Sequence, residues 1–253
     1  MSNETATASI EVSQKGSDNA ISIYKNQKSI PTLIISASGA GKSFSMFNLP
    51  PEKTFLINIM GKQLPFMGAF DYIEETNMHS SADYSKIIRA MKMASDNKDI
   101  EYLIIDDMQY IMATEFMNTT HIKGFDKWND MAKHIWEIIL LSSKLRPGLK
   151  VFLLTHEDDD GRKRKMKTLG RLLEDKITPE GLVTIVLFAE VGGTRDKRSY
   201  FFSTQSDGYT TAKSPYDMFP SKIPNDLKLV SDRIDEYYSR IPLKNSKINM
   251  EVK

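Results

Sequence analysis

The segment Ser36 to Ser43 reads Ser-Ala-Ser-Gly-Ala-Gly-Lys-Ser and follows the apolar run Thr32 to Ile35. These are the residue types of a phosphate-binding loop. Glycines let backbone N–H groups surround phosphates, a lysine reaches the β- and γ-phosphates, and a hydroxyl binds Mg²⁺. The sequence therefore predicts a site for ATP and Mg²⁺. The residues expected to bind the nucleotide are Ser38, Gly39, Ala40, Gly41, Lys42, Ser43 and Phe44.

Ser36 departs from the usual pattern, because it stands where the first glycine should be. We expect this serine to need a backbone conformation that glycine reaches more easily, while Gly39 and Gly41 remain free to adopt it. A helix is expected directly after the loop, with its positive end facing the phosphates. The order of strand, loop and helix favours this interpretation over a chance Gly/Ser-rich turn.

A second group of candidate residues follows the apolar run Tyr102 to Ile105, which ends in Asp106 and Asp107. A carboxylate at the end of a neighbouring parallel strand can hold Mg²⁺ opposite the loop hydroxyl of Ser43. We assign Asp106 to the metal and Asp107 to the attacking water. Many NTPases of this architecture have a glutamate as general base, so Glu115 is the nearest alternative downstream.

The third candidate is His156, at the end of the apolar run Val151 to Thr155. A polar side chain there can contact the γ-phosphate and respond to its hydrolysis. Four acidic residues follow, and then a basic cluster. That cluster is either a solvated loop that neutralises its own charge or a nucleotide-dependent contact with a nucleic-acid backbone. The candidate DNA-binding residues are Arg162, Lys163, Arg164, Lys165 and Lys167.

Composition narrows the classes of function. The 253 residues contain 34 Lys and Arg against 33 Asp and Glu, so no overall charge attracts the chain to DNA or to a membrane. Cysteine is absent, which excludes disulfides, thiol catalysis and cysteine-bound zinc. The four histidines lack metal-ligand spacing. No apolar run is long enough for a membrane span, and we expect a cytoplasmic protein.

The order of elements predicts an α/β fold in which a mostly parallel sheet is flanked by helices, with an antiparallel hairpin at one edge. A helix is expected between Trp128 and Leu145, and a last one after Pro224, capped by Asn225 or Asp226. Turns are expected at Gly192-Gly193-Thr194 and Ser206-Asp207-Gly208. The expected strands are Thr32 to Ile35, Thr54 to Ile59, Tyr102 to Ile105, Val151 to Thr155 and Val183 to Ala189, followed by the edge segment Ser199 to Ser203. Residues 1–20 are predicted to be a flexible leader, 21–241 one domain and 242–253 a flexible tail.

From about Ile30 to Tyr238 the chain resembles the phage-encoded AAA-type, RecA-like core ATPases of single-strand annealing and recombination. The resemblance rests on the phosphate loop, the Ile-Ile-Asp-Asp strand and the Leu-Thr-His strand end. It also rests on segments farther along the chain. These are Lys167-Thr168-Leu169-Gly170 before Leu172 to Ile177, Thr211-Ala212-Lys213-Ser214-Pro215, and Ile223-Pro224-Asn225-Asp226-Leu227.

This resemblance implies a P-loop ATPase of RecA-like fold that oligomerises as a ring or filament on single-stranded DNA, with ATP and Mg²⁺ at subunit interfaces. It implies phage single-strand-binding or replication proteins as partners and the host cytoplasm as location. Lys213 would enter a neighbouring subunit's site and neutralise charge on the transferred phosphoryl group. RecA itself has its catalytic glutamate just after the second strand, where this chain has Met60-Gly61-Lys62.

Three functions remain open from the sequence. The first is an ATPase that acts on single-stranded DNA in annealing or strand exchange. The second is a nucleotide-gated switch or loader with little turnover, which the missing glutamate favours. The third is a small-molecule kinase in which the segment Arg162 to Lys167 forms a lid; the carboxylate pair and the polar strand end argue for the ATPase instead.

Overall fold

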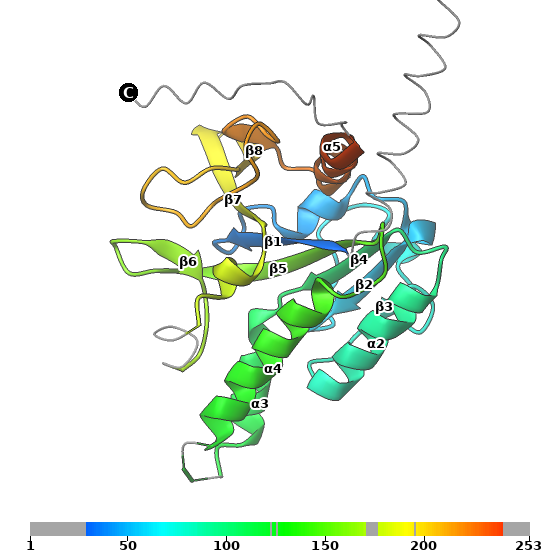
Figure 1. The fold of residues 1–253 in the computed structure, drawn as a ribbon, viewed down its shortest axis with the longest axis vertical. Helices are drawn as coiled ribbons and strands as arrows, with labels where there is room; N and C mark the ends of the chain where they lie inside the picture. Colours follow the sequence, from blue (N-terminus) through cyan, green and yellow to red (C-terminus); the bar gives the residue numbers. More distant parts are fainter. Residues whose placement is uncertain (1–28, 122, 125, 171–176, 195, 240–253) are drawn as a thin grey trace, which may run out of the picture.

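The computed structural model describes residues 29–121, 123–124, 126–170, 177–194 and 196–239. The predicted leader (1–20) and tail (242–253) lie outside these residues, as does most of the segment Leu172 to Ile177. Figure 1 shows a central sheet with helices on both sides. The part of the chain that is described therefore has the layered α/β architecture that the sequence predicts.

The sheet has nine strands in the order β3-β2-β4-β5-β1-β7-β8-β9, with β6 paired to β5 outside this path. Strands β1 to β5 and β7 pair in parallel, whereas β8 and β9 form the expected antiparallel edge. The strands are β1 (Ile30–Ser36), β2 (Thr54–Asn58), β3 (Met78–His79), β4 (Tyr102–Asp106), β5 (Lys150–Asp159), β6 (Arg164–Met166), β7 (Ile185–Thr194), β8 (Lys197–Ser203) and β9 (Lys222–Pro224).

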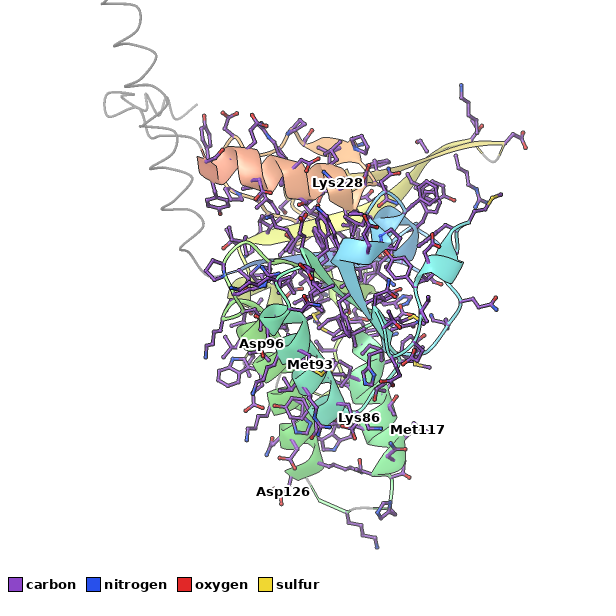
Figure 2. The ribbon with its side chains drawn as sticks, turned by 90° about the vertical axis from the view of Figure 1, so that its right-hand side faces the viewer. Lys86, Met93, Asp96, Met117, Asp126 and Lys228 are labelled. Atoms are coloured by element: carbon purple, nitrogen blue, oxygen red, sulfur yellow. The ribbon has the colours of Figure 1, made fainter. Side chains whose placement is uncertain are left out.

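Helices pack on both faces of this sheet. Alternate residues of β1 point to opposite faces, so that Leu33 and Ile35 belong to one buried cluster and Ile34 to the other. The helices are α2 (Tyr84–Asp96), α3 (Gln109–Asn118), α4 (Asp126–Ser142) and α5 (Leu227–Ser239). The first three cover one face, and α5 covers the other (Figure 1). The side chains labelled in Figure 2, such as Lys86 on α2 and Lys228 on α5, lie on these two outer layers.

The helix ends follow from local sequence. Asp83 caps α2, because its carboxylate accepts the backbone N–H of Lys86 at 2.9 Å. Of the two predicted caps of the last helix, Asp226 fills the role: its Oδ1 accepts the N–H of Lys228 at 2.8 Å. The helix predicted between Trp128 and Leu145 corresponds to α4, which buries Met131, Ile135 and Ile138 and ends three residues before Leu145. None of the described helices is long and apolar enough to cross a bilayer.

The helix after the phosphate loop is much shorter than predicted. Only a four-residue 3₁₀ helix, Ser43–Met46, forms there. Pro50 and Pro51 follow closely. Proline lacks an N–H, and it disfavours the helical conformation of the preceding residue, so the helix cannot extend. The phosphate site must therefore depend on the loop's own amides more than on a long helix dipole.

Two further expectations need correction. Gly192, Gly193 and Thr194 lie inside β7 rather than in a turn. Gly193 has φ +86°, and a Cβ there would meet the backbone of Lys197 on the facing strand, so glycine is needed for close strand contact. The other expectation was that β4 would pair directly with β1, the strand that leads into the phosphate loop. In the structure β5 lies between β4 and β1.

Candidate nucleotide-binding site

The predicted phosphate loop borders a pocket of about 450 Å³. The loop follows β1, and the other walls come from segments that follow β2 and β4, from His156 in β5 and, beyond these four strands, from Tyr200 in β8. All four strands run parallel, so their carboxyl ends meet at one edge of the sheet. The pocket is lined by Ala37, Ser38, Gly39, Gly41, Lys42, Ser43, Phe44, Lys62, Pro65, Asp107, His156 and Tyr200.

Backbone geometry makes the loop suitable for phosphate. Gly39 and Gly41 have φ of 79° and 86°, in the left-handed region that glycine reaches at little cost. Within the described part of the chain, the N–H groups of Gly41, Lys42 and Ser43 have no backbone acceptor. Unpaired amides of this kind bind anions. The loop can therefore surround a phosphate group.

Ser36 does not need the special conformation expected of it. It is the last residue of β1, is fully buried, and is not among the residues with positive φ. The turn begins only after it, so the strained positions fall to Gly39 and Gly41. The Ser36 hydroxyl is buried and has no hydrogen-bond partner among the described residues.

Residues from the antiparallel edge close over the loop. Asn225 donates its Nδ2–H to the carbonyl of Gly41 at 2.9 Å. A Cβ at Gly41 would lie 2.6 Å from Asn225 Nδ2 and 2.9 Å from Tyr200 Cδ1. From the sequence, Asn225 was predicted only as a possible helix cap, and Tyr200 only as part of an edge strand. Both residues support the loop because the segments around β8 and β9 fold back over it.

The loop lysine contacts both predicted carboxylates. Lys42 Nζ lies 2.7 Å from Asp107 Oδ1 and 3.4 Å from Asp106 Oδ1, and all three side chains are buried. Buried charges of this kind must be paired. The phosphate loop and the end of β4 are therefore in contact, although β5 separates the two strands.

Asp107 is the centre of the polar contacts in the pocket. Besides Lys42, its carboxylate contacts the Nζ of Lys62, and Oδ1 lies 3.4 Å from His156 Nε2. Burial disfavours the charged carboxylate, but the contacts with His156, Lys42 and Lys62 outweigh burial and hold the pKa of Asp107 well below its usual value. Asp107 also has φ 63°, an uncommon conformation that aspartate tolerates better than most residues.

Lys62 also lines the pocket, although the sequence alone predicted no role for it. Burial alone would lower the pKa of Lys62, but the hydrogen bond and charge of Asp107 raise it above its ordinary value, which keeps the lysine cationic. Its position just after β2 is the signal that could have identified it, since that segment was already compared with the site of a catalytic glutamate.

The donor groups expected for Mg²⁺ are hard oxygen ligands, a hydroxyl at Ser43 and a carboxylate at Asp106, which fit this ion. Ser43 lines the pocket. Asp106, the last residue of β4, does not line it, and its Oδ1 lies 3.4 Å from Lys42 Nζ. The assignment of both residues to the metal stays a prediction.

His156 follows the buried part of β5 and lines the pocket, as its predicted sensor role requires. Its backbone N–H donates to Gln109 Oε1 at 3.1 Å. The Nε2 of Gln109 is buried without a partner among the described residues. The carbonyl of His156 accepts the N–H of Lys167 at 2.8 Å, which joins the sensor candidate to the basic segment.

The alternative base Glu115 lies in a different pocket. Its Oε1 is 2.7 Å from Nδ1 of His134, whose ring stacks on Tyr84 at a centroid distance of 4.0 Å. This group joins α2, α3 and α4 and does not reach the phosphate loop. Glu115 is therefore not placed to activate water at the pocket described above.

The basic cluster forms a β-hairpin of β5 and β6. Arg162 and Lys163 at its tip are exposed, as is Lys167, whereas Lys165 is half-buried. Arg164 differs from the others: its Nη2 and Nε lie 2.7 and 3.0 Å from Glu157 Oε2. The DNA-binding role of the five bases stays a prediction, and Arg164 is the member already engaged in an ion pair.

Of two other predicted site residues, Phe44 and Lys213, only Phe44 lines the pocket. Phe44 lines the pocket, is 43% exposed, and stacks on Phe47 with a centroid distance of 5.6 Å. Lys213 does not line the pocket of its own chain; its backbone pairs with Val186 of β7. Its role in a neighbouring subunit's site stays a prediction.

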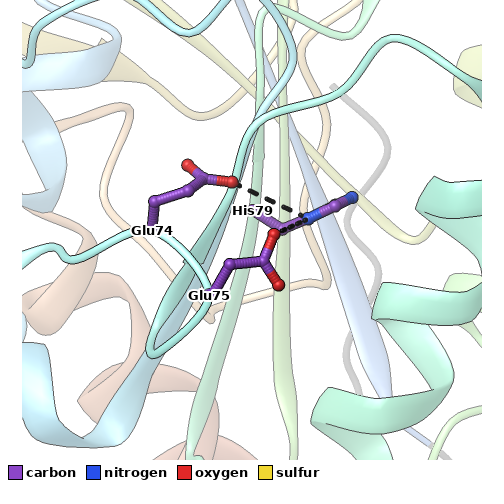
Figure 3. Close-up of side chains that lie close together, drawn as sticks. All are labelled: Glu74, Glu75 and His79. Atoms are coloured by element: carbon purple, nitrogen blue, oxygen red, sulfur yellow. Dashed lines mark ion pairs between the residues drawn. The ribbon is translucent and has the colours of Figure 1, made fainter.

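A separate group of potential metal ligands lies at the other edge of the sheet, where Figure 3 shows Glu74, Glu75 and His79 close together. His79 Nδ1 is 3.8 Å from both carboxylates. Both oxygens of Glu74 already accept hydrogen bonds from Ser80, at 2.7 Å each. These hydrogen bonds explain the position of the Glu74 carboxylate as part of a surface turn.

No family model matches this sequence, and no curated protein matches it by sequence. Among solved structures, the chain is similar to the KaiC-like protein PH0186 from the hyperthermophilic archaeon Pyrococcus horikoshii OT3. The two share 9% identity over 69% of this chain and 78% of that one, with a TM-score of 0.44. The function proposed next therefore rests on the residues of the pocket.

Proposed function

We propose that this protein is a P-loop ATPase that binds ATP with Mg²⁺ and acts on single-stranded DNA. The observation that carries the nucleotide-binding part is the contact of Lys42 with Asp106 and Asp107, opposite a glycine loop with unpaired amides. A lysine held by two carboxylates at a phosphate loop is ready to exchange them for phosphate oxygens.

The proposed reaction is hydrolysis of the γ-phosphate. The oxygen of water bonds to the γ-phosphorus while the bond to the β–γ bridging oxygen breaks, and that bond's electron pair stays on ADP. One proton of the water remains on the released phosphate, and the other passes to solvent. Lys42 binds the phosphates, and Asp107 orients the water. Mg²⁺, when bound by Ser43 and Asp106, offsets phosphate charge.

The DNA-binding part is supported by the β5–β6 hairpin. Arg162 and Lys163 are exposed at its tip, and Lys167 is joined through its N–H to the carbonyl of His156. A change at the γ-phosphate can therefore reach the basic segment through one backbone hydrogen bond. The β7–β8 ribbon, which extends beyond the body in Figure 2, adds the exposed residues Lys197 and Arg198. We propose annealing or strand exchange, as in phage recombination, as the output.

We further propose that the protein works as an oligomer in which Lys213 reaches a neighbouring subunit's nucleotide. The position of Lys213 outside its own pocket is compatible with this role. Phage single-strand-binding or replication proteins are the proposed partners.

A nucleotide-gated switch with little turnover is the second candidate. The strong hold of Lys42 and Lys62 on Asp107 favours it, because a carboxylate with a depressed pKa is a weak base. The kinase alternative has less support, since β6 is paired with β5 and Arg164 is bound to Glu157, unlike a lid that must open.

The test is ATP hydrolysis by purified protein without DNA, with duplex DNA and with single-stranded DNA, using Asp107→Asn as the control. Stimulation by single strands that disappears in the variant supports the proposal. Saturating ATP binding with no hydrolysis under any condition would instead support the switch.

A further inference from the structure

Hydrogen bonds to the backbone around Lys62 fix the position of this residue at the pocket. Gly61, with φ 59°, turns the chain after β2 and donates its N–H to the carbonyl of Asn58 at 3.1 Å. The side chain of Asn58 in turn donates to the carbonyl of Lys62 at 2.7 Å. Asn58 is buried at the end of β2, where it pairs with Asp106. This arrangement fixes Lys62 beside the end of β4.

The side chain of Lys62 extends from this fixed backbone into the pocket. Its Nζ contacts Asp107 Oδ2 and lies 5.6 Å from the centre of the Tyr110 ring. The side chain is 57% exposed, so fewer neighbours confine it than confine the buried Lys42. Lys62 and the phosphate loop line the same pocket. A triphosphate held by the loop therefore lies within the space that Lys62 borders.

The charges in the pocket give Lys62 a role that Lys42 cannot fill alone. Without nucleotide, two lysines face two carboxylates. A triphosphate adds several negative charges and takes Lys42, which leaves Lys62 as the second lysine among the lining residues, partly exposed and beside Asp107. Negative charge spreads over the γ-phosphoryl oxygens and the leaving oxygen as the bond breaks. A cation at that point stabilises the transition state more than the ground state.

We propose that Lys62 is a catalytic residue of its own subunit, which contacts the γ-phosphoryl group and stabilises the charge that develops there during hydrolysis. The inference rests on the proposed ATPase function and extends it. It also differs from the role proposed for Lys213, because no neighbouring subunit is needed to supply this cation.

The experiment compares four proteins: wild type, Lys62→Met, Lys62→Arg and Lys53→Met. Methionine keeps the length and apolar stem but removes the charge, and arginine keeps the charge. Lys53 is an exposed control that pairs with Glu101 at 2.8 Å, away from the pocket. For each protein we would measure the affinities for ADP and ATP, kcat, KM, and the affinity for ADP with aluminium fluoride, which mimics the phosphoryl group in transfer. Thermal melting checks the fold.

We expect Lys62→Met to lower kcat by roughly 100- to 1000-fold, the usual effect of losing one transition-state donor. ADP affinity should stay within about threefold, because ADP lacks the γ-phosphoryl group, and the aluminium fluoride complex should be lost. Lys62→Arg should recover part of kcat. Lys53→Met should behave as wild type.

Turnover by Lys62→Met equal to that of wild type would overturn this inference and leave the proposed ATPase intact. A wild type that binds ATP but never hydrolyses it would also overturn it, while leaving nucleotide binding in place. A wild type that binds no nucleotide would reject the proposed function itself. An equal loss of ADP and ATP affinity in Lys62→Met would reduce Lys62 to a binding or structural role.

Discussion

Lys42 Nζ lies 2.7 Å from Asp107 Oδ1, although 65 positions separate the two residues in the chain. The contact joins the phosphate loop to the end of β4 across the intervening strand β5. It satisfies two buried charges without nucleotide, and it must open when the lysine binds phosphate. The ion pair therefore stabilises the protein without nucleotide, and nucleotide binding must replace it with contacts between Lys42 and phosphate.

Lys42→Ala is expected to remove tight nucleotide binding. A charged hydrogen bond contributes about 1.5–3 kcal/mol, so ATP affinity should fall by roughly 10- to 150-fold. The free energy of unfolding should also fall, by about 1–3 kcal/mol, since Asp106 and Asp107 lose their shared partner. Calorimetric titration with ATP measures the first effect and urea unfolding the second. Unchanged ATP affinity in a folded variant would refute the assignment of the loop.

Gly41→Ala is expected to weaken ATP binding more than Gly39→Ala does. Both glycines have positive φ, so alanine costs about 1–2 kcal/mol of backbone strain at either position. Only at Gly41 does the added Cβ also meet Asn225 and Tyr200; at Gly39 nothing lies within 4 Å. The difference between the two variants thus isolates the contact with the antiparallel edge.

Adding Tyr200→Ala to Gly41→Ala should recover part of the lost affinity, because it removes one of the two clashing side chains. ATP affinities of the single and double variants, measured side by side, test this coupling. Equal effects of the two glycine variants, with no recovery in the double variant, would show that the edge segments do not support the loop.

Most of the strands and the loop could be predicted because their signals are local. Strands β1, β2, β4, β5 and β7 are built on apolar runs, and the glycines and lysine of the loop lie close together in sequence. The short strands β3, β6 and β9 lack such a run and were not predicted. The contacts of Asp107 could not be predicted in the same way. Lys62 reaches it only because β2 pairs with β4 so that Asn58 faces Asp106, a register that no local pattern specifies.

The errors have physical causes too. The short helix after the loop reflects Pro50 and Pro51, whose effect was present in the sequence but was not weighed against the usual motif. Gly193 was predicted to lie in a turn because glycine is typical of turns. In the structure glycine is needed for another reason, since a Cβ at this position would collide with the backbone of Lys197 on the facing strand. Arg164 looked like one of five equivalent bases, and only the fold brings Glu157 to its Nη2 and Glu190 to its Nη1.

Asp107→Asn is expected to flatten the loss of stability in acid. The folded-state pKa of Asp107 lies below the ordinary value of 3.8, so its carboxylate contributes stability that is present above that value. This contribution is lost as the pH falls through the folded-state pKa. Wild type should be the more stable protein near neutral pH, and the two should converge as the pH falls below about 4.

Urea unfolding of both proteins over a series of pH values measures this difference. Other carboxylates titrate in both proteins and cancel in the comparison. A constant difference in unfolding free energy from neutral pH to about pH 3 would mean that Asp107 does not titrate differently in the folded and unfolded chains.

The last prediction separates the exposed bases of the β5–β6 hairpin from Arg164. Replacing Arg162 and Lys163 together by alanine should weaken binding of single-stranded DNA and reduce the slope of log K against log salt by about 1.4, since each phosphate contact on a single strand contributes about 0.7. Melting temperature should not change, because both side chains are exposed. Replacing Lys86 and Lys92 on α2, which are equally exposed, is the matched control and should leave the slope unchanged.

Arg164→Ala should instead lower the melting temperature and leave the salt dependence of DNA binding almost unchanged. It leaves Glu157 and Glu190 without their half-buried partner, so the melting temperature should fall while the salt slope changes little. Thermal melting and DNA titrations at several salt concentrations distinguish the two sets. If the hairpin variant and the α2 control have the same salt slope, the hairpin is a solvated surface and the DNA must bind elsewhere. If Arg164→Ala alone reduces the slope, the ion pair with Glu157 opens on binding and the exposed tip is not the contact.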